Sequence, residues 1–144
     1  MQPTFLTATV LTLLPGLALS DTYEVRMLNR GDSRSMVYKP DFLALQPGDT
    51  VTFIATHPSH NAASIPEIWP EDAPQVKGQI NEEIEVTFET PGFYGIKCSP
   101  HYTMGMVMLV QVGDGDPGKL VVPTSLPDMV QDCMAYIVES DHEY

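Results

Sequence analysis

The alternation of apolar and polar residues between positions 22 and 112 predicts a series of short β-strands. Residues 23–27 and 84–88 alternate strictly, which is typical of strands with one buried face. Turn signals such as Pro47-Gly48-Asp49 and Pro91-Gly92 separate the strands. Several short strands at regular spacing predict an all-β sandwich or barrel. The strands are expected at residues 23–27, 50–56, 84–88, 93–97 and 105–112.

The pattern changes after a Gly- and Asp-rich linker at residues 113–118. Apolar residues then recur at helical spacing, and Pro127 suits a position in the first turn of a helix. The apolar stripe consists of Leu126, Val130, Cys133 and Ile137. We therefore expect a helical segment that begins at about residue 117 and packs on the sandwich.

Residues 1–20 have the features of a secretory signal peptide. They carry no charged side chain, contain an apolar run at residues 10–14, and place the small residues Ala18 and Ser20 before a polar stretch. The apolar run is too short for a membrane span, which makes a permanent N-terminal anchor the less favoured alternative. Removal of this segment leaves residues 21–144, the size of one domain with a sizeable core.

The charge of the chain limits its partners. The formal net charge is -12 at pH 7, and residues 1–20 contribute none of it. A strongly acidic domain is a poor ligand for nucleic acid or for an anionic membrane, so neither is expected as a partner. After signal removal we also expect no membrane insertion.

The chemistry-bearing residues gather at 98–106, which read Cys-Ser-Pro-His-Tyr-Thr-Met-Gly-Met. A thiolate, an imidazole and a thioether fall in this short segment, and Pro100 and Gly105 supply the restricted and the permissive backbone of a tight turn. An upstream histidine adds a second imidazole. Two His and one Cys with a weak axial Met form a blue copper site. The predicted ligands of one type 1 copper ion are His60, Cys98, His101 and Met106.

Two other arrangements of these residues are possible. In an exported chain, Cys98 and Cys133 could form a disulfide, but Cys98 has metal-ligand spacing and Cys133 lies in the apolar helical stripe, which favours two free thiols. His57 precedes His60 by three positions, so a zinc or copper chelate by these two is the other alternative. It lacks a fixed Cys or carboxylate partner.

Four blocks of residues match a known family: residues 24–29, 47–53, 60–61 and, most specifically, 97–106. On these blocks the chain resembles the pseudoazurins, which are small cupredoxins, over essentially all of residues 21–144. The resemblance implies a Greek-key β-sandwich of eight strands with C-terminal α-helices, and one copper ion. It also selects Met106 over Met104 as the axial ligand, because four residues separate His101 from Met106, as in pseudoazurin-like loops.

The family also implies roles for residues beside the ligands. Asn61 resembles the residue whose backbone N–H points at the cysteine sulfur and whose side chain joins the two ligand loops. Met36 resembles a residue that packs beside the exposed histidine. The exposed edge of His101 is the implied path of the electron, within an apolar docking face formed by Met36, Pro100, Tyr102 and Met104.

The implied function is that of a periplasmic electron carrier and not an enzyme, since four histidines cannot build a further catalytic copper site. Copper nitrite reductase or another denitrification reductase is the expected acceptor, in a transient complex. The alternatives are a carrier for a different periplasmic oxidoreductase and a copper storage or delivery protein.

Arg30, Lys77 and Lys97 match basic family positions, whereas Pro58 stands where a lysine is common. A retained steering patch and ordinary solvated charges are both open.

Overall fold

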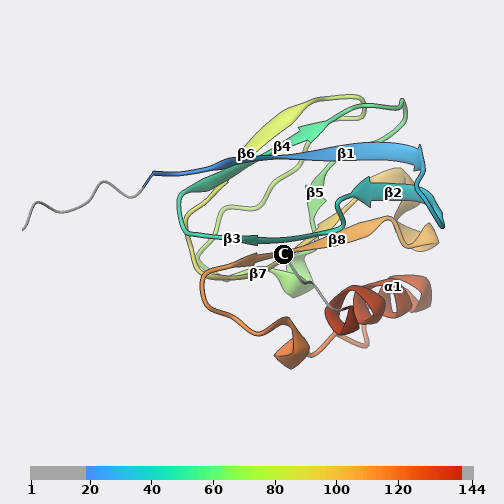
Figure 1. Cartoon of the computed structure of the whole chain (residues 1–144). Helices are drawn as coiled ribbons and strands as arrows, with labels where there is room; N and C mark the ends of the chain where they lie inside the picture. The colour runs from blue at the N-terminus through green and yellow to red at the C-terminus, as the bar shows by residue number, and fades with distance from the viewer. Residues whose placement is uncertain (1–18, 141–144) are drawn as a thin grey trace, which may run out of the picture.

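Two β-sheets packed face to face form the body of the molecule (Figure 1). The computed structural model describes residues 19–140, so residues 1–18 of the predicted signal peptide and the tail at 141–144 lie outside the described residues. Within 19–140, no helix is both long enough and apolar enough to cross a membrane. The sandwich confirms the predicted all-β class and excludes the barrel.

Each sheet has four strands, which gives the eight that the resemblance implies for the described part of the chain. Parallel pairs between β1 and β4 and between β3 and β8 show that the chain crosses between sheets, as a Greek-key sandwich requires. The first sheet, in spatial order, contains β2 (Ser35–Lys39), β1 (Thr22–Arg30), β4 (Asp49–Ile54) and β6 (Ile84–Phe88). The second contains β3 (Phe42–Leu45), β8 (Val107–Val112), β7 (Gly92–Lys97) and β5 (Ala63–Ser64).

Strand β8 is buried along its whole length because both of its faces are covered. Met108 and Val110 belong to the cluster between the two sheets, which we call the inner core. Val107 and Leu109 belong to a second cluster between the second sheet and the C-terminal helix, which we call the outer core. Since side chains alternate between the faces of a strand, β8 contributes to both cores.

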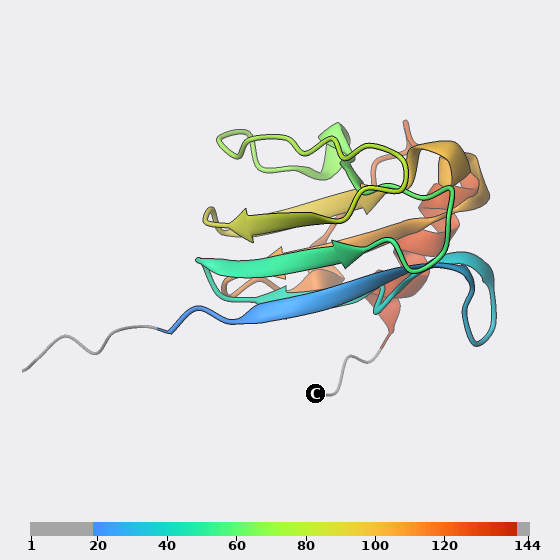
Figure 2. The ribbon, with the colours of Figure 1, turned by 90° about the horizontal axis from the view of Figure 1, so that it is seen from above.

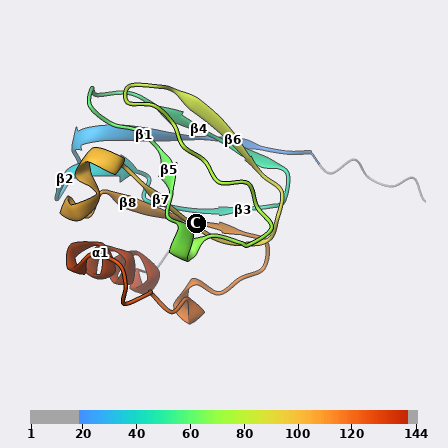
Figure 3. The same cartoon turned by 180° about the vertical axis from the view of Figure 1, so that it is seen from behind.

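The C-terminal helix α1 (Asp128–Glu139) covers the outer face of the second sheet (Figure 3). All four residues of the predicted apolar stripe are buried there, as expected. Pro127 is the N-cap rather than a first-turn residue, and its carbonyl accepts N–H bonds from Val130 and Gln131. The expectation of several C-terminal α-helices is wrong for the described residues, where the segment from 117 contains a short 3-10 turn, η3 (Pro117–Lys119), and then α1 alone.

Three connections meet at one end of the sandwich (Figure 2). They are the β1–β2 hairpin, the loop at residues 55–62 that follows β4, and the 3-10 turn η2 (Ser99–Met104) that joins β7 to β8. Pro100 lies in the first turn of η2, and Gly105 ends it in the left-handed conformation at φ 84°. The predicted roles of these two residues in shaping a tight turn are confirmed.

Candidate metal centre

Three of the four predicted ligands come together where the loop at 55–62 meets η2. The ligand atoms of His60, Cys98 and His101 all lie within 4.8 Å of one another. The Cys98 sulfur is 3.6 Å from His60 Nδ1 and 3.4 Å from His101 Nδ1. His60 and Cys98 have no exposed surface, whereas His101 is partly exposed. The site is therefore a buried pocket with one edge toward solvent.

These separations fit a single metal ion. Bonds of about 2.0 Å to imidazole and about 2.3 Å to thiolate place the two ligand atoms about 3.4–3.7 Å apart at angles of about 105–120°. Both measured sulfur–nitrogen distances, 3.6 Å and 3.4 Å, are of this size. One thiolate and two imidazoles form the soft, nitrogen-containing donor set that copper favours.

The orientation of His60 is fixed by Asn29 at the end of β1. The His60 Nε2 atom lies 2.7 Å from Asn29 Oδ1. Because an amide oxygen can only accept, Nε2 carries the proton and Nδ1 is left to bind a metal. An outer hydrogen bond of this kind holds a ligating imidazole in one orientation.

Asn61 joins the two ligand loops. Its Oδ1 atom accepts the N–H of Ser99 at 2.7 Å, while its Nδ2 donates to Ser99 Oγ at 3.1 Å and to the carbonyl of Gly78 at 3.0 Å. The hydroxyl of Tyr38 donates to the Asn61 carbonyl at 2.6 Å. The loop that carries His60 is therefore tied directly to the residue that follows Cys98, as the resemblance implied.

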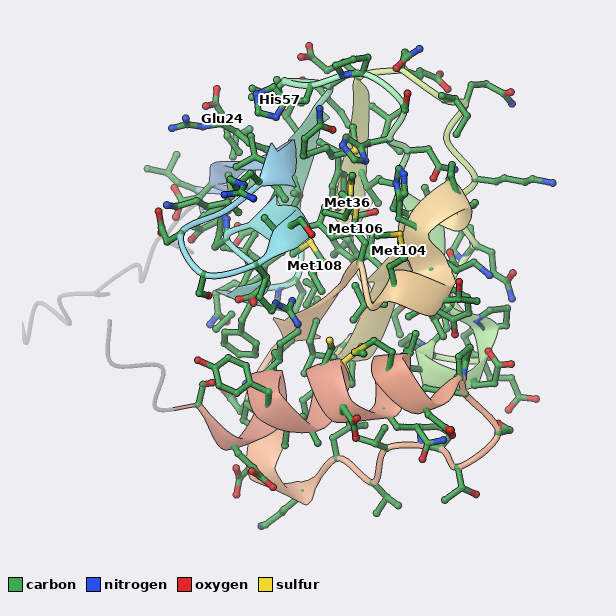
Figure 4. The ribbon with its side chains drawn as sticks, turned by 90° about the vertical axis from the view of Figure 1, so that its right-hand side faces the viewer. Glu24, Met36, His57, Met104, Met106 and Met108 are labelled. Atoms are coloured by element: carbon green, nitrogen blue, oxygen red, sulfur yellow. The ribbon has the colours of Figure 1, made fainter. Side chains whose placement is uncertain are left out.

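Met106 and Met104, both labelled in Figure 4, differ in burial. Met106 is fully buried in the inner core, in the same cluster as Cys98, whereas Met104 is 53% exposed. The Met106 N–H donates to the His101 carbonyl at 3.2 Å, and its carbonyl accepts the Cys98 N–H at 3.1 Å. Burial and backbone bonding favour Met106, and its bond to the metal stays a prediction.

The alternative arrangements lose their support in this geometry. Cys98 and Cys133 are both free thiols, as expected, and they belong to different cores. His57 is absent from the group of close ligand atoms, and its Nδ1 accepts the N–H of Asn29 at 2.9 Å. That nitrogen is therefore not available for a chelate with His60.

Comparison with known proteins agrees with this geometry. Residues 25–113 match the family of copper-binding proteins described as plastocyanin/azurin. Pseudoazurin from Paracoccus pantotrophus is 51% identical over 100 residues, which are 69% of this chain and 68% of the relative. A putative pseudoazurin from Rhizobium leguminosarum is 42% identical over 127 residues, 87% of this chain and 82% of the relative. The chain belongs to the pseudoazurin family.

The solved structure of native pseudoazurin from Hyphomicrobium denitrificans supports the same assignment. It has a TM-score of 0.75 and 37% identity, and the match covers 81% of this chain and 95% of that one. Copper is accordingly the cofactor of this chain, and its family is one of blue copper electron-transfer proteins.

The protein environment of this site disfavours charge on His60 and Cys98 before metal binds. Burial lowers the pKa of His60, and the nearby His101 and His57 lower it further. Burial raises the pKa of the Cys98 thiol, while hydrogen bonds from the backbone of Asn61 and His101 act in the opposite direction. A bound cation reverses this preference for the thiol, because the thiolate is the metal ligand.

One functional residue was missed by the sequence analysis. Asn29 fell within a matching family block, but no role was predicted for its side chain. It lies 31 positions before His60, and neither periodicity nor spacing indicates the contact. The signal that could have found it is the need of any ligating imidazole for a partner on its second nitrogen.

Proposed function

We propose that this chain carries single electrons between redox proteins in the periplasm, as a carrier and not as an enzyme. His60, Cys98, His101 and Met106 are the proposed ligands of one copper ion, which supplies the one-electron couple when bound. Copper nitrite reductase or another reductase of denitrification is the proposed acceptor. The observation that carries the proposal is the group of three ligand atoms within 4.8 Å, of which His101 alone is partly exposed.

The surface around His101 supports transient docking. Pro100 and Met104 are exposed, and Tyr102 is partly exposed on the same turn. Met36 is partly buried and packs against the inner core (Figure 4). A small apolar surface around the exposed ligand allows an electron-transfer contact that forms and breaks quickly. His101 is the proposed exit path for the electron.

The rigidity of the site supports electron transfer over copper storage. The Asn61 bonds fix both ligand loops, and Asn29 fixes the ring of His60. Ligands that are held before the metal changes its oxidation state need little rearrangement, which lowers the barrier to electron transfer. Storage or delivery requires a ligand set that opens readily, and three of the four proposed ligands, His60, Cys98 and Met106, are fully buried.

The uncharged N-terminal segment and its apolar run support export to the periplasm. N-terminal sequencing of the protein recovered from the periplasmic fraction tests this. A mature chain that begins near Asp21 is expected, and a full-length chain in the cytoplasmic fraction would contradict it.

The function is tested by adding Cu(II) to the metal-free protein and recording its visible spectrum. An intense blue absorption is expected. The reduced protein is then mixed with purified copper nitrite reductase and nitrite, and the blue colour should return as electrons leave. Colour without reoxidation would contradict the proposed acceptor, whereas weak colour with rapidly exchanging copper would support a delivery protein.

The proposal also includes steering of the redox partner toward the copper site by basic residues on the surface. Arg30 and Lys77 are exposed, and the Lys97 ammonium lies 4.8 Å from the centre of the Tyr102 ring. Arg34 joins them, because it lines the same surface pocket as Arg30 and Met104. A local basic patch on an acidic protein should speed association with an acidic partner. The rate of reductase turnover should then fall with salt and in Lys97→Glu, and a flat response would reject steering.

A further inference from the structure

The sulfur of Cys133 lies against the end of the turn that carries the copper ligands. A methyl group built on Gly105 would be 2.6 Å from Cys133 Sγ, 2.9 Å from Met129 Cγ and 3.3 Å from the Met129 carbonyl. Carbon atoms in proteins do not approach sulfur so closely, so no residue larger than glycine fits between the turn and α1 without a shift of its neighbours. Gly105 has φ 84° and directly precedes Met106. The helix therefore limits how far the Gly105 backbone can move outward.

Gly105 and Met106 lie at the boundary between the two cores. Met106 is buried in the inner core with Cys98, whereas Cys133 is buried in the outer core with the rest of α1. A displacement of Gly105 toward α1 thus draws Met106 away from the inner core. The axial position of a blue copper site is weak and long, so small changes there alter its electronic properties.

A second contact fixes the Cys133 sulfur itself. Arg34, in the connection of the β1–β2 hairpin, donates from Nη1 to Cys133 Sγ. Arg34 and Cys133 both line a cavity of about 740 Å³ between the hairpin and α1. The sulfur is thus held between the hairpin and the ligand turn, with 4% of Cys133 exposed. An ordinary core thiol needs neither contact.

We propose that Cys133 is a positioning residue for the copper site. Its sulfur, held by Arg34, supports Gly105 from the outside and so sets the depth at which Met106 enters the inner core. The inference rests on the proposed role of Met106 as the axial ligand. It assigns a function to α1, which otherwise only covers a sheet.

The first test compares Cys133→Ala with Cys133→Ser in the copper-loaded protein. Cys133→Ala removes the support, so Gly105 relaxes outward, the axial thioether donates less to Cu(II), and the reduction potential rises. Cys133→Ser keeps an acceptor for Arg34 and should restore part of the shift. Ile137→Val, one helical turn further along α1 and buried in the same core, is the matched control. It should lower thermal stability without moving the potential.

The second test uses the metal-free protein and needs no copper chemistry. In Cys133→Ala the Met106 amide should exchange with solvent about tenfold faster than in wild type, because the turn loses its outer contact. Amides in β6, which is far from α1 in the fold, should keep their exchange rates (Figure 1). Ile137→Val again serves as the control for a general loosening of α1.

A double-mutant cycle isolates the contact. Gly105→Ala should lower the melting temperature and shift the potential, since its methyl meets the Cys133 sulfur. In the Cys133→Ala background the steric part of both effects should disappear, leaving the cost of φ 84° and of the contact with Met129. Equal effects of Gly105→Ala in the two backgrounds would overturn the inference.

The failure of this inference and the failure of the proposed function give different results. If wild type is blue and neither Cys133 variant shifts the potential or the Met106 exchange rate, Cys133 is only a core residue. If wild type binds no copper, the ligand assignment fails, and the exchange data still report whether Cys133 holds the turn.

Discussion

The two cysteines place their sulfur atoms in two different regions of the molecule. Cys98 lies in the inner core, where its sulfur meets two imidazole nitrogens at 3.6 Å and 3.4 Å. Cys133 lies in the outer core, where its sulfur meets an arginine and the backbone of a glycine turn. Both are free and nearly inaccessible to solvent. Burial and residue type therefore do not separate a metal ligand from a packing residue.

What separates the two regions is the set of neighbours that the topology supplies. The end of the sandwich brings the loop after β4 to the turn after β7, and each carries a ligand. The outer core instead stacks α1 on β8 and β3, and its members are almost all apolar. Within residues 19–140, the first region alone brings nitrogen and sulfur ligand atoms together at one point, so blue copper chemistry belongs there.

The two cysteines should differ most when each sulfur is replaced by oxygen. Cys98→Ser should abolish the intense blue absorption, because that colour comes from the bond between copper and thiolate. Cys133→Ser should keep the colour, since its sulfur faces no second ligand atom. Visible spectra of both variants after Cu(II) addition provide the measurement. A colourless Cys133→Ser protein would mean that the outer sulfur also binds the metal.

The two methionines of the turn provide the next test. Met106→Leu should raise the reduction potential and alter the visible spectrum, because the axial thioether tunes the metal. A tenfold change in the relative affinity for the two oxidation states corresponds to about 59 mV for one electron. Met104→Leu should leave both properties nearly unchanged, as Met104 is 53% exposed. Voltammetry measures the potential, and the reverse pattern would reassign the axial ligand.

The strands that the sequence predicted are those with clear alternation or strong turn signals. Residues 84–88 were predicted with the bounds that β6 has, and the four other expected strands overlap β1, β4, β7 and β8. The pattern did not reveal β2, β3 and β5. β5 has only 2 residues, which is too short a run to show a period. In β2 and β3 apolar residues follow one another without alternation, at Met36–Tyr38 and at Phe42–Leu45. In β2, Met36 also has φ 54°, which departs from extended backbone.

The ligands were predictable because three of the four sit in one short segment that spacing alone can identify. The expected strand at 105–112 begins instead at Val107, because Gly105 ends η2 in a left-handed conformation. The bond from His60 to Asn29 and the contact of Cys133 with Gly105 could not be predicted. Both join segments about 30 positions apart, and only the folded chain brings them together.

Loss of the Asn61 hydrogen bonds that join the two ligand loops should have a smaller effect on the copper site. Asn61→Ala should lower the free energy of unfolding by about 1–3 kcal/mol, because it leaves buried partners such as the Gly78 carbonyl unpaired. Copper should also dissociate faster, since the His60 loop is no longer tied to Ser99. Chemical denaturation and competition with a chelator measure the two effects.

The control for Asn61→Ala is Asn81→Gly, at a residue that also bonds to the loop at residues 55–62. Asn81 Oδ1 accepts the N–H of Ser59 at 2.6 Å, and glycine keeps its φ of 66° without strain. This variant loses a bond of the same kind without touching the Cys98 side. If it releases copper as fast as Asn61→Ala does, the joining of the two ligand loops is not the cause.

The smallest effect on the metal is expected from a large change in the outer core. Ile137 is 1% exposed in the packing between α1 and the second sheet, so Ile137→Ala should lower the free energy of unfolding by about 2–5 kcal/mol. The visible spectrum and the reduction potential should stay near those of wild type, because this side chain lies one helical turn beyond the Cys133 contact. Thermal unfolding and voltammetry on the same sample check both parts. A potential that moves as far as in Met106→Leu would show that the two cores are coupled through the whole helix rather than through the single sulfur that supports Gly105.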